Sequence, residues 1–329
     1  MDMARRWGSV AIFALAACSV AAQDKTGKPD DTLSAVVGIS ARIQSNARSA
    51  ATLGTQRRGS GALIRDDYVL TIGYLIIEAE AIEVTGPGGR TVPATLAGYD
   101  HASGFGLLKL VAPLGGKPLA LGESQALAER DPAMVATAAG AEGVNLVRVV
   151  SRRPFSGSWE YQLDSAIFTY PPVAEWSGAP LIGVRGELLG LGSLIVADAG
   201  APGTQSPGNM FVPIDLVKPI LADLIANGRR SGPARPWLGV NADEVRGHLF
   251  VSRVSPEGPA ERAGLRSGDI VLAVGDQEVA SLPDFYRHLW SRGAAGIEVP
   301  IRVLQGAQVK ELSVRSIDRS EYFRARPTF

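Results

Sequence analysis

The segment Thr169-Tyr-Pro-Pro-Val-Ala-Glu-Trp-Ser-Gly-Ala-Pro-Leu181 is a proline-rich loop that leads into an apolar, strand-like run at 181–184. It places Ser177 directly before small residues. Such residues let the backbone turn tightly and bring its N–H groups close to a reacting carbonyl, as an oxyanion hole requires. A Ser-Gly-Ala-Pro tetrapeptide is also a common turn. The sequence around Ser177 therefore decides whether this serine is a candidate nucleophile.

Length and composition bound the fold. The chain has 329 residues, of which 46% are hydrophobic, so it can bury a sizeable core and is long enough for two domains. Lys plus Arg (33) equal Asp plus Glu (33), and this balance gives no electrostatic footprint for nucleic acid. Gly (38) and Pro (21) are abundant without a fixed period, which favours short strands joined by turns over helix bundles.

Residues 33–228 repeat one pattern, in which short apolar or β-branched runs alternate with Gly, Asp and Asn turns. The predicted strands are Ala35–Ile39, Gly61–Ile64, Tyr68–Thr71, Ala81–Val84, Gly106–Leu110, Ala133–Ala136 and Leu188–Leu191. Their spacing indicates a pair of β-barrels or a sandwich. A helix is expected to close this block, with Asp215 as its N-cap, an apolar stripe from Leu216 to Leu224, and Gly228 at the C-cap position.

The N-terminus has the pattern of a signal peptide, which we place at residues 1–22. Arg5 and Arg6 precede an apolar run that is too short to span a bilayer as a mature helix. The run ends in Leu15-Ala-Ala-Cys18, which resembles the lipobox of bacterial lipoproteins; the single cysteine, Cys18, would then be acylated. The alternative is a secretory signal that is cut after Ala22. Either interpretation places the mature chain outside the cytoplasm, with residues 23–32 as a solvated tether.

Further motifs identify a family. In chain order they are Gly59-Ser-Gly-Ala-Leu-Ile64, Tyr68-Val-Leu-Thr71, Gly98-Tyr-Asp100, Gly106-Leu-Leu-Lys109, Leu119-Ala-Leu-Gly122, Ser177-Gly-Ala-Pro-Leu181 and Val212-Pro-Ile-Asp-Leu-Val-Lys-Pro219. This series resembles the trypsin-like domain of the HtrA (DegP-like) serine proteases, in the order that the family has them. No single motif is decisive, but their shared order is. The resemblance implies a mostly β chain, with a trypsin-like double β-barrel at 33–228.

The remainder of the chain is similar to the PDZ domain of the same family. After a linker at 229–235, the PDZ-like part covers 236–318, and 319–329 form a C-terminal tail. Pro259–Ile270 resembles the short helix and turn of a small α+β PDZ domain, and Val271–Val279 the hairpin that follows. Residues Ser281 to Asp284 form a capping box for the next helix.

The resemblance implies a peptide-binding site in this domain. The N–H groups of Trp237-Leu-Gly-Val240 would capture the C-terminal carboxylate of a peptide, while the peptide adds a strand beside this segment. Phe285 and Leu289, on one face of the predicted helix, belong to the same site. The simpler alternative is ordinary core for Leu238 and Phe285 and a tight turn for Gly239.

The candidate catalytic machinery departs from the family. A serine protease of this fold needs an imidazole to accept the serine proton and a carboxylate to orient that imidazole. Tyr74 stands at the family's histidine position, Gly104 at its aspartate position, and Glu175 at the glycine that helps to form the oxyanion hole. A carboxylate near a developing oxyanion would repel it. His101, three residues before Gly104, is the one histidine outside the PDZ-like part.

We therefore expect an inactive relative of these proteases, in which Ser177 survives without partners. Its PDZ-like domain would bind C-termini or exposed segments of envelope proteins, in protein quality control, as a scaffold, or as a modulator of an active relative. Two alternatives stay open: an endopeptidase with an unusual base such as His101 or Glu175, and a structural lipoprotein. Neither a cofactor nor a metal is expected.

The expected location is the periplasm or cell envelope, with attachment to a membrane if Cys18 is acylated. HtrA trimers are held by aromatic residues near the start of the protease domain, and residues 33–59 contain none, so the sequence leaves the oligomeric state open. The tail ends in Arg326-Pro-Thr-Phe329, an apolar C-terminus of the kind that such PDZ domains accept. It would suit its own groove or that of a neighbour; the alternative is a frayed terminus.

Overall fold

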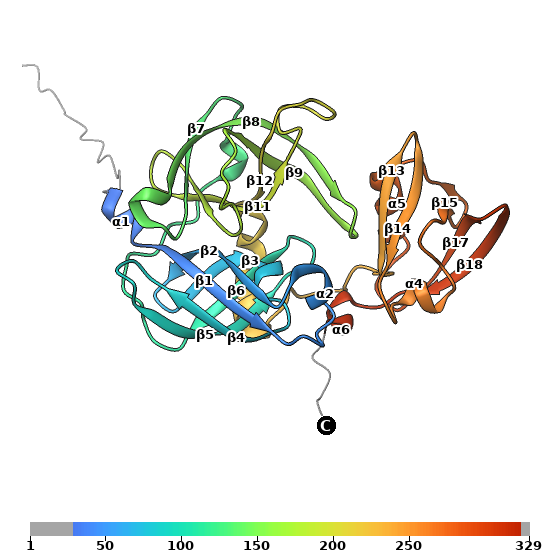
Figure 1. Cartoon of the computed structure of the whole chain (residues 1–329), viewed down its shortest axis with the longest axis horizontal. Helices are drawn as coiled ribbons and strands as arrows, with labels where there is room; N and C mark the ends of the chain where they lie inside the picture. Colours follow the sequence, from blue (N-terminus) through green and yellow to red (C-terminus); the bar gives the residue numbers. More distant parts are fainter. Residues whose placement is uncertain (1–28, 324–329) are drawn as a thin grey trace, which may run out of the picture.

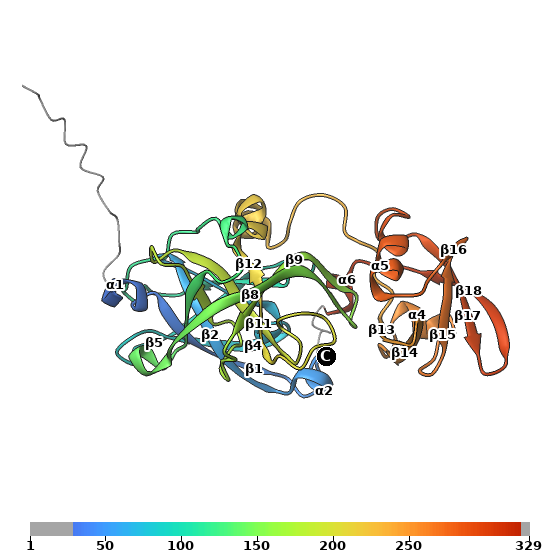
Figure 2. The same ribbon diagram turned by 90° about the horizontal axis from the view of Figure 1, so that it is seen from above.

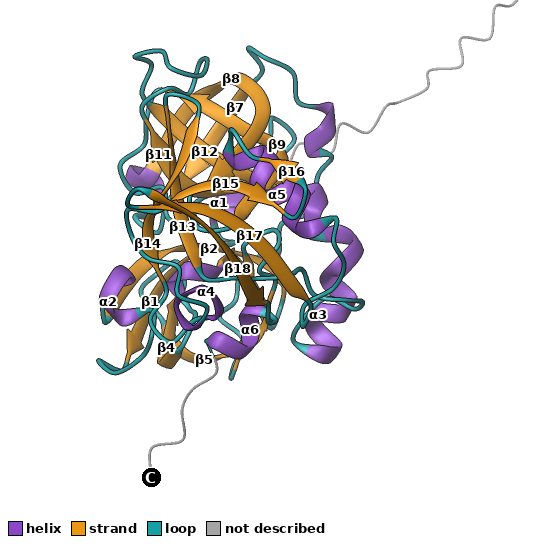
Figure 3. Cartoon of the chain, turned by 90° about the vertical axis from the view of Figure 1, so that its right-hand side faces the viewer, coloured by secondary structure: helices purple, strands orange, loops and turns teal. Residues whose placement is uncertain are grey.

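The computed structural model describes residues 29–323, which form two closed β-barrels and a smaller C-terminal domain (Figure 1). The chain is mostly β, as the sequence predicts. Figure 3 shows strands in all three parts, with short helices around them. The predicted signal peptide, Cys18 and residues 324–329 lie outside the described part of the chain. Within residues 29–323, no helix has the length and apolar character needed to cross a membrane.

The first barrel is closed in the order β1-β2-β3-β6-β5-β4. Its strands are β1 (Val36–Ile43), β2 (Gln56–Arg65), β3 (Tyr68–Ile72), β4 (Ala79–Thr85), β5 (Thr91–Tyr99) and β6 (Phe105–Leu110). It also carries α1 (Pro29–Leu33), α2 (Ala50–Leu53) and the 3-10 turn η1 (Gly73–Leu75). Side chains alternate between the two faces of a strand. Val37, Ile39 and Leu70 accordingly lie in the barrel core, at most 3% exposed.

The second barrel is closed in the order β10-β11-β12-β9-β8-β7. Its strands are β7 (Pro132–Ala136), β8 (Val144–Gly157), β9 (Tyr161–Tyr170), β10 (Pro180–Ile182), β11 (Leu188–Val196) and β12 (Gly208–Pro213). The 3-10 turn η2 (Ser124–Ala126) precedes this barrel, η3 (Gly140–Gly143) connects β7 and β8, and η4 (Ile214–Leu216) and η5 (Lys218–Ile220) follow the barrel. Ser177 lies on the loop between β9 and β10, where the two barrels meet.

All seven strands predicted for this region exist, but the sequence pattern does not reveal β5, β8, β9 and β12. The pairing of β8 with β9 shifts register after Val149 and again after Arg153, so their polar and apolar residues lose the regular alternation. Every residue of β12 is buried, which leaves no alternation to detect.

The helix that closes the barrels begins later than expected. Residues 214–220 form two 3-10 turns, and α3 spans Leu221–Asn227 (Figure 3). Asp215 does not cap this helix: its carboxylate accepts hydrogen bonds from Ser124 Oγ and the Gln125 N–H, both at 2.7 Å. The prediction of its capping role was wrong because η2 supplies these competing donors. Gly228 does end the helix in the left-handed conformation (φ 71°), as predicted.

The C-terminal domain contains one antiparallel sheet in the order β13-β14-β15-β17-β18, and β16 also pairs with β15. The strands are β13 (Val240–Val245), β14 (His248–Val254), β15 (Ile270–Val274), β16 (Gln277–Glu278), β17 (Glu298–Gln305) and β18 (Gln308–Arg315). The helices are α4 (Pro259–Arg262), α5 (Leu282–Trp290) and α6 (Arg319–Tyr322). Ser281 caps α5, accepting a hydrogen bond from the Asp284 N–H at 3.2 Å, which confirms the predicted capping box.

Two sets of contacts join the C-terminal domain to the barrels. The first is the tip of the β8–β9 hairpin, which extends out of the second barrel toward the C-terminal domain (Figures 1 and 2). Its Ser158 carbonyl accepts a hydrogen bond from the Ala242 N–H of β13 at 3.0 Å. On the other side of the tip, the Tyr286 hydroxyl of α5 donates to the Gly157 carbonyl.

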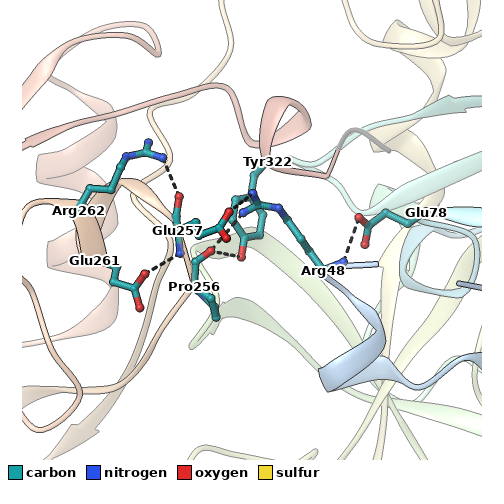
Figure 4. Close-up of polar contacts among 7 residues, drawn as sticks. All are labelled: Arg48, Glu78, Pro256, Glu257, Glu261, Arg262 and Tyr322. Atoms are coloured by element: carbon teal, nitrogen blue, oxygen red, sulfur yellow. Dashed lines mark hydrogen bonds and ion pairs between the residues drawn. The ribbon is translucent and has the colours of Figure 1, made fainter. Parts of the chain in front are cut away.

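The second set is centred on Arg48 of the first barrel (Figure 4). Its guanidinium donates to the Pro256 carbonyl (3.1 Å), pairs with the Glu257 carboxylate (2.9 Å) and lies 4.1 Å from the centre of the Tyr322 ring. The Tyr322 hydroxyl also donates to Pro256 (2.9 Å). Glu78 holds the backbone N–H of Arg48 at 3.2 Å. Because Tyr322 belongs to α6, the start of the predicted tail is a packed helix that contacts both the barrel and the C-terminal domain.

Candidate functional site

Ser177 lies where the two barrels touch. Its carbonyl accepts a hydrogen bond from the Ser60 N–H of β2 at 2.8 Å. Two glycines permit this close approach. A Cβ on Gly59 would lie 2.5 Å from the Ser177 carbonyl oxygen, and a Cβ on Gly178, where φ is +69°, would lie 2.1 Å from the Ser60 carbonyl oxygen. The first barrel therefore fixes the backbone of the candidate nucleophile.

Tyr74, at the end of β3 in η1, is the partner of Ser177. Its hydroxyl lies 2.8 Å from Ser177 Oγ and donates to the Ser193 carbonyl oxygen at 3.0 Å. A tyrosine hydroxyl has a single proton, and a carbonyl oxygen can only accept. With the Tyr74 proton directed at Ser193, the proton of Ser177 must point at the phenol oxygen. The serine thus donates to a neutral phenol.

The electrostatics keep Tyr74 neutral. Burial raises the pKa of Tyr74 to about 12, although the hydrogen bond from Ser177 acts in the opposite direction. A phenol with this pKa is ionised in only about 10⁻⁵ of molecules at pH 7. Tyr74 therefore fills the space beside Ser177 without supplying a base that could remove its proton.

No side chain at residue 104 can orient a base. Gly104 has φ of +82°, and its carbonyl accepts a hydrogen bond from the Gly73 N–H at 2.7 Å, which supports η1 from behind. The nearest carboxylate in this loop, Asp100, is buried and pairs with Arg230 of the linker at 2.8 Å. It also accepts hydrogen bonds from Ser103. Asp100 therefore holds the linker and the loop through its contacts with Arg230 and Ser103.

His101 does not take over the role of the missing imidazole. Its ring packs against Tyr99, with the ring centres 4.3 Å apart, and against Phe323 at 6.1 Å. Burial, together with the nearby positive charge of Arg319, holds the pKa of His101 well below its usual value. Within residues 29–323, the hydrogen bond that Ser177 Oγ makes is with Tyr74 and not with an imidazole.

Glu175 is exposed on the rim of the cleft that contains Ser177, with Arg58 on the same cleft. Glu175 lies two residues before the serine in the sequence. The cleft that contains Ser177 is therefore lined by one acidic and one basic side chain, those of Glu175 and Arg58.

The predicted peptide-binding residues fall into two groups. Leu238, Phe285 and Leu289 are at most 1% exposed and lie in the core of the C-terminal domain. Trp237 is also buried, and its N–H donates to the Ile317 carbonyl at 3.0 Å. Only three of the four N–H groups of this segment therefore remain as candidates for binding a ligand. The fourth, that of Trp237, is paired with the chain that follows β18.

The other three N–H groups, those of Leu238, Gly239 and Val240, already hold a carboxylate. It belongs to Glu160, at the tip of the β8–β9 hairpin. The distances to its oxygens are 3.0 Å from Leu238, 2.7 Å from Gly239 and 2.8 Å from Val240. The conformation of Gly239, with φ of +86°, brings successive N–H groups toward one point, as in an anion-binding nest.

Glu160 is a buried acid, 6% exposed, in a left-handed conformation (φ 55°). Desolvation raises its pKa to about 7, against the opposing effects of the three backbone N–H groups and the positive charge of Arg319. The hairpin backbone is held as well, since the Glu160 N–H donates to the Tyr286 hydroxyl at 3.0 Å. Sequence analysis missed this residue because Ser158-Trp-Glu160 carries no motif, and only the fold brings it to the carboxylate-binding segment.

Comparison with known proteins agrees with this architecture. Residues 59–191 match the family model of the trypsin-like peptidase domain, and residues 236–315 match that of the PDZ domain. The chain is 25% identical over 298 residues to the "Serine protease Do-like HtrB" of Bacillus subtilis. It is 29% identical over 289 residues to a "Probable periplasmic serine endoprotease DegP-like" of Pseudomonas fluorescens.

These matches cover 80% and 81% of this chain but 62% and 58% of the two relatives, so the chain spans little more than half of their length. Among solved structures, the "HtrA-type protease AlgW with decapeptide" has a TM-score of 0.53 at 20% identity, covering 87% of this chain and 96% of that one. This likeness concerns the fold. A structure from Yersinia pestis described as a serine endoprotease gives 0.51 at 22% identity.

The fold and the Ser177 loop define a trypsin-like peptidase domain that is followed by a PDZ domain. Given this domain pair and the HtrA and DegP-like names of its relatives, the chain belongs to the HtrA (DegP-like) family.

Removing the Tyr74 hydroxyl should cost stability. We expect Tyr74→Phe to lower the free energy of unfolding by about 1–2 kcal/mol, because hydrogen bonds to Ser177 and Ser193 are lost at a buried site. Chemical denaturation of the two proteins measures the difference. Tyr68→Phe is the matched control, since Tyr68 is a buried tyrosine of the same barrel. An equal loss in both variants would contradict the specific role of the Tyr74 hydroxyl.

The raised pKa of Glu160 predicts a pH dependence of stability. Its folded pKa, about 7, exceeds the ordinary value of 4.5, so the folded state holds the proton more tightly. The stabilisation is present below pH 4.5 and is lost as the pH rises through 7, by up to about 3 kcal/mol. Arg319 and the Tyr286 hydroxyl face the carboxyl group, and burial raises the pKa of Tyr286, so its phenol stays neutral in this range.

The measurement is the difference in unfolding free energy between wild type and Glu160→Gln from pH 4.5 to pH 8. The other ionisable groups are common to both proteins, so their contributions cancel in this difference. A difference that stays constant across the range would show that Glu160 does not titrate there.

Proposed function

We propose that this protein is a catalytically silent HtrA-like protein whose working chemistry is the recognition of peptides. The observation that carries the proposal is the hydrogen bond from Ser177 to the neutral Tyr74 phenol, which among residues 29–323 is the hydrogen bond that Ser177 Oγ makes. Gly104 provides no carboxylate, and His101 packs against Tyr99 and Phe323. The described part of the chain thus keeps the serine, but it does not place beside it the base that would activate its hydroxyl.

The magnitude of this loss supports the proposal. Removing the catalytic triad of a serine protease lowers kcat by roughly 10⁶-fold, equivalent to about 8 kcal/mol of transition-state stabilisation. A typical turnover of about 10 per second would fall to about one event per day. The exposed Glu175 carboxylate at the rim of the cleft adds electrostatic repulsion. Binding, by contrast, requires none of these groups.

Recognition is proposed to occur in the PDZ domain. Its ligands would be the C-termini or exposed segments of other envelope proteins, because backbone N–H groups at 238–240 suit a carboxylate and β13 is an edge strand that a peptide can extend. The barrels would then serve as a scaffold or as a modulator of an active relative. Several relatives are named periplasmic, which supports a location in the cell envelope.

The alternative is an active endopeptidase with an unusual base, and a serine-directed probe separates the two. We expect a fluorophosphonate to leave Ser177 unlabelled and unfolded casein to remain uncleaved, because the phenol that accepts the hydrogen bond of Ser177 is too weak a base to remove its proton. An active trypsin-like protease serves as the positive control and Ser177→Ala as the negative control. Stoichiometric labelling of the wild type, or casein cleavage that disappears in Ser177→Ala, would establish the enzyme instead.

Attachment to a membrane is the remaining part of the proposal. If Cys18 is acylated, metabolic labelling with palmitate in a bacterial host should tag the wild type and spare Cys18→Ala. Signal cleavage after Ala22 would remove the cysteine and leave both proteins unlabelled. The two outcomes distinguish an anchored protein from a freely secreted one.

A further inference from the structure

The N–H groups of the carboxylate-binding segment of the PDZ domain already have a hydrogen-bond acceptor from the same chain. The N–H groups of Leu238, Gly239 and Val240 donate to the carboxylate of Glu160, with the shortest distances between 2.7 and 3.0 Å. Glu160 lies almost 80 residues away in the sequence, on a hairpin of the second barrel. A terminal carboxylate of another protein would need the same three donors.

The hairpin also takes the place of the peptide backbone. A peptide that extends an edge strand pairs with it through alternate residues. The carbonyl of Ser158, two residues before Glu160, accepts a hydrogen bond from the Ala242 N–H, two residues after Val240. The spacing on the hairpin therefore matches the spacing on β13. The Ser158 carbonyl and the Glu160 carboxylate of the hairpin thus accept hydrogen bonds from the N–H groups that would otherwise bind the C-terminal end of an added peptide strand.

Helix α5, on the opposite side of the groove, and helix α6 also contact the hairpin tip at 157–160. Tyr286 of α5 donates its hydroxyl proton to the Gly157 carbonyl and accepts a hydrogen bond from the Glu160 N–H. From α6, Arg319 donates to the Trp159 carbonyl at 3.2 Å. The hairpin tip at 157–160 is thus held from β13, from α5 and from α6. It lies between the strand and the helix that form the two sides of the groove.

We infer that the PDZ groove is closed by an internal ligand, in which the Glu160 side chain stands in for a C-terminal carboxylate, so that a partner with a free C-terminus binds only by displacing the β8–β9 hairpin. The inference rests on the proposed peptide recognition and adds its regulation. Because hairpin and groove belong to one chain, the hairpin competes at a high effective concentration. The apparent affinity for a partner equals the intrinsic affinity multiplied by the fraction of molecules in which the hairpin is undocked.

The first test measures the internal contact without any partner. Amide hydrogen exchange of residues 238–240 is compared in the full-length wild type, Glu160→Ala and Glu160→Gln. Glu142→Ala is the matched control, an exposed glutamate of the same barrel. We expect at least tenfold faster exchange at 238–240 in Glu160→Ala, a smaller increase in Glu160→Gln, whose amide oxygen still accepts, and no change in the control. Equal protection in all four proteins would overturn the inference.

The second test measures competition. The probe is a fluorescent pool of decapeptides that end in Val, Leu or Phe with a free carboxylate, and the control is the same pool with amidated C-termini. We expect Glu160→Ala to bind the free-acid pool at least tenfold more tightly than the wild type and the amidated pool no better. Circular dichroism of each variant shows whether it is folded.

The outcomes separate this inference from the proposed function. Equal affinity of the wild type and Glu160→Ala for the free-acid pool would overturn the internal ligand and leave peptide recognition intact. If neither protein binds the pool while exchange at 238–240 accelerates in Glu160→Ala, the docked hairpin is supported and the proposed peptide recognition fails. Faster exchange together with tighter binding supports both.

Discussion

One buried carboxylate connects the two halves of this molecule. Glu160 leaves the second barrel on a hairpin and enters the PDZ domain, where it meets three backbone N–H groups. Burying an ionisable acid is costly unless its charge is compensated. Here the compensation comes from the nest at 238–240 and from Arg319, and even so the pKa of Glu160 rises to about 7. The arrangement of the domains and the state of the groove both depend on this contact.

The remaining contacts between the domains act around the same centre. Arg48, Pro256 and Tyr322 form a second junction on the side of the first barrel (Figure 4). Asp100 anchors the linker through Arg230. Because α6 contributes both Tyr322 and Arg319, the segment after β18 connects these junctions. The PDZ domain is therefore docked through several polar contacts, each of them weaker than a packed core and individually replaceable.

The peptidase domain retains the close contact between its two barrels that positions Ser177. Gly59 and Gly178 still allow the close approach that fixes the Ser177 loop. Tyr74 preserves the packing and the hydrogen bonding of the site, yet its phenol remains protonated at any physiological pH. A site of this kind keeps the shape of the fold. Among residues 29–323, the hydrogen bond of Ser177 Oγ is with the Tyr74 phenol.

The sequence by itself determined the family and the two kinds of domain. Ordered local motifs such as Gly59–Ile64 and Ser177–Leu181 carry that information, and they also led to the prediction that Tyr74 stands at the family's histidine position. The capping box at Ser281 and the helix end at Gly228 were equally local, and both are confirmed. Strands β8 and β9 escaped detection because bulges interrupt their alternation.

Only the tertiary structure determined which residues that are distant in the chain contact one another. It directed the hydroxyl of Tyr74 at Ser177, packed His101 against aromatic rings, and engaged Asp215 with η2 in place of a helix end. It also brought Glu160 to the PDZ segment. These outcomes depend on contacts between residues far apart in the chain, and a backbone N–H is the same group in every residue but proline. A local pattern of side chains therefore could not predict which carboxylate the backbone N–H groups of residues 238–240 bind.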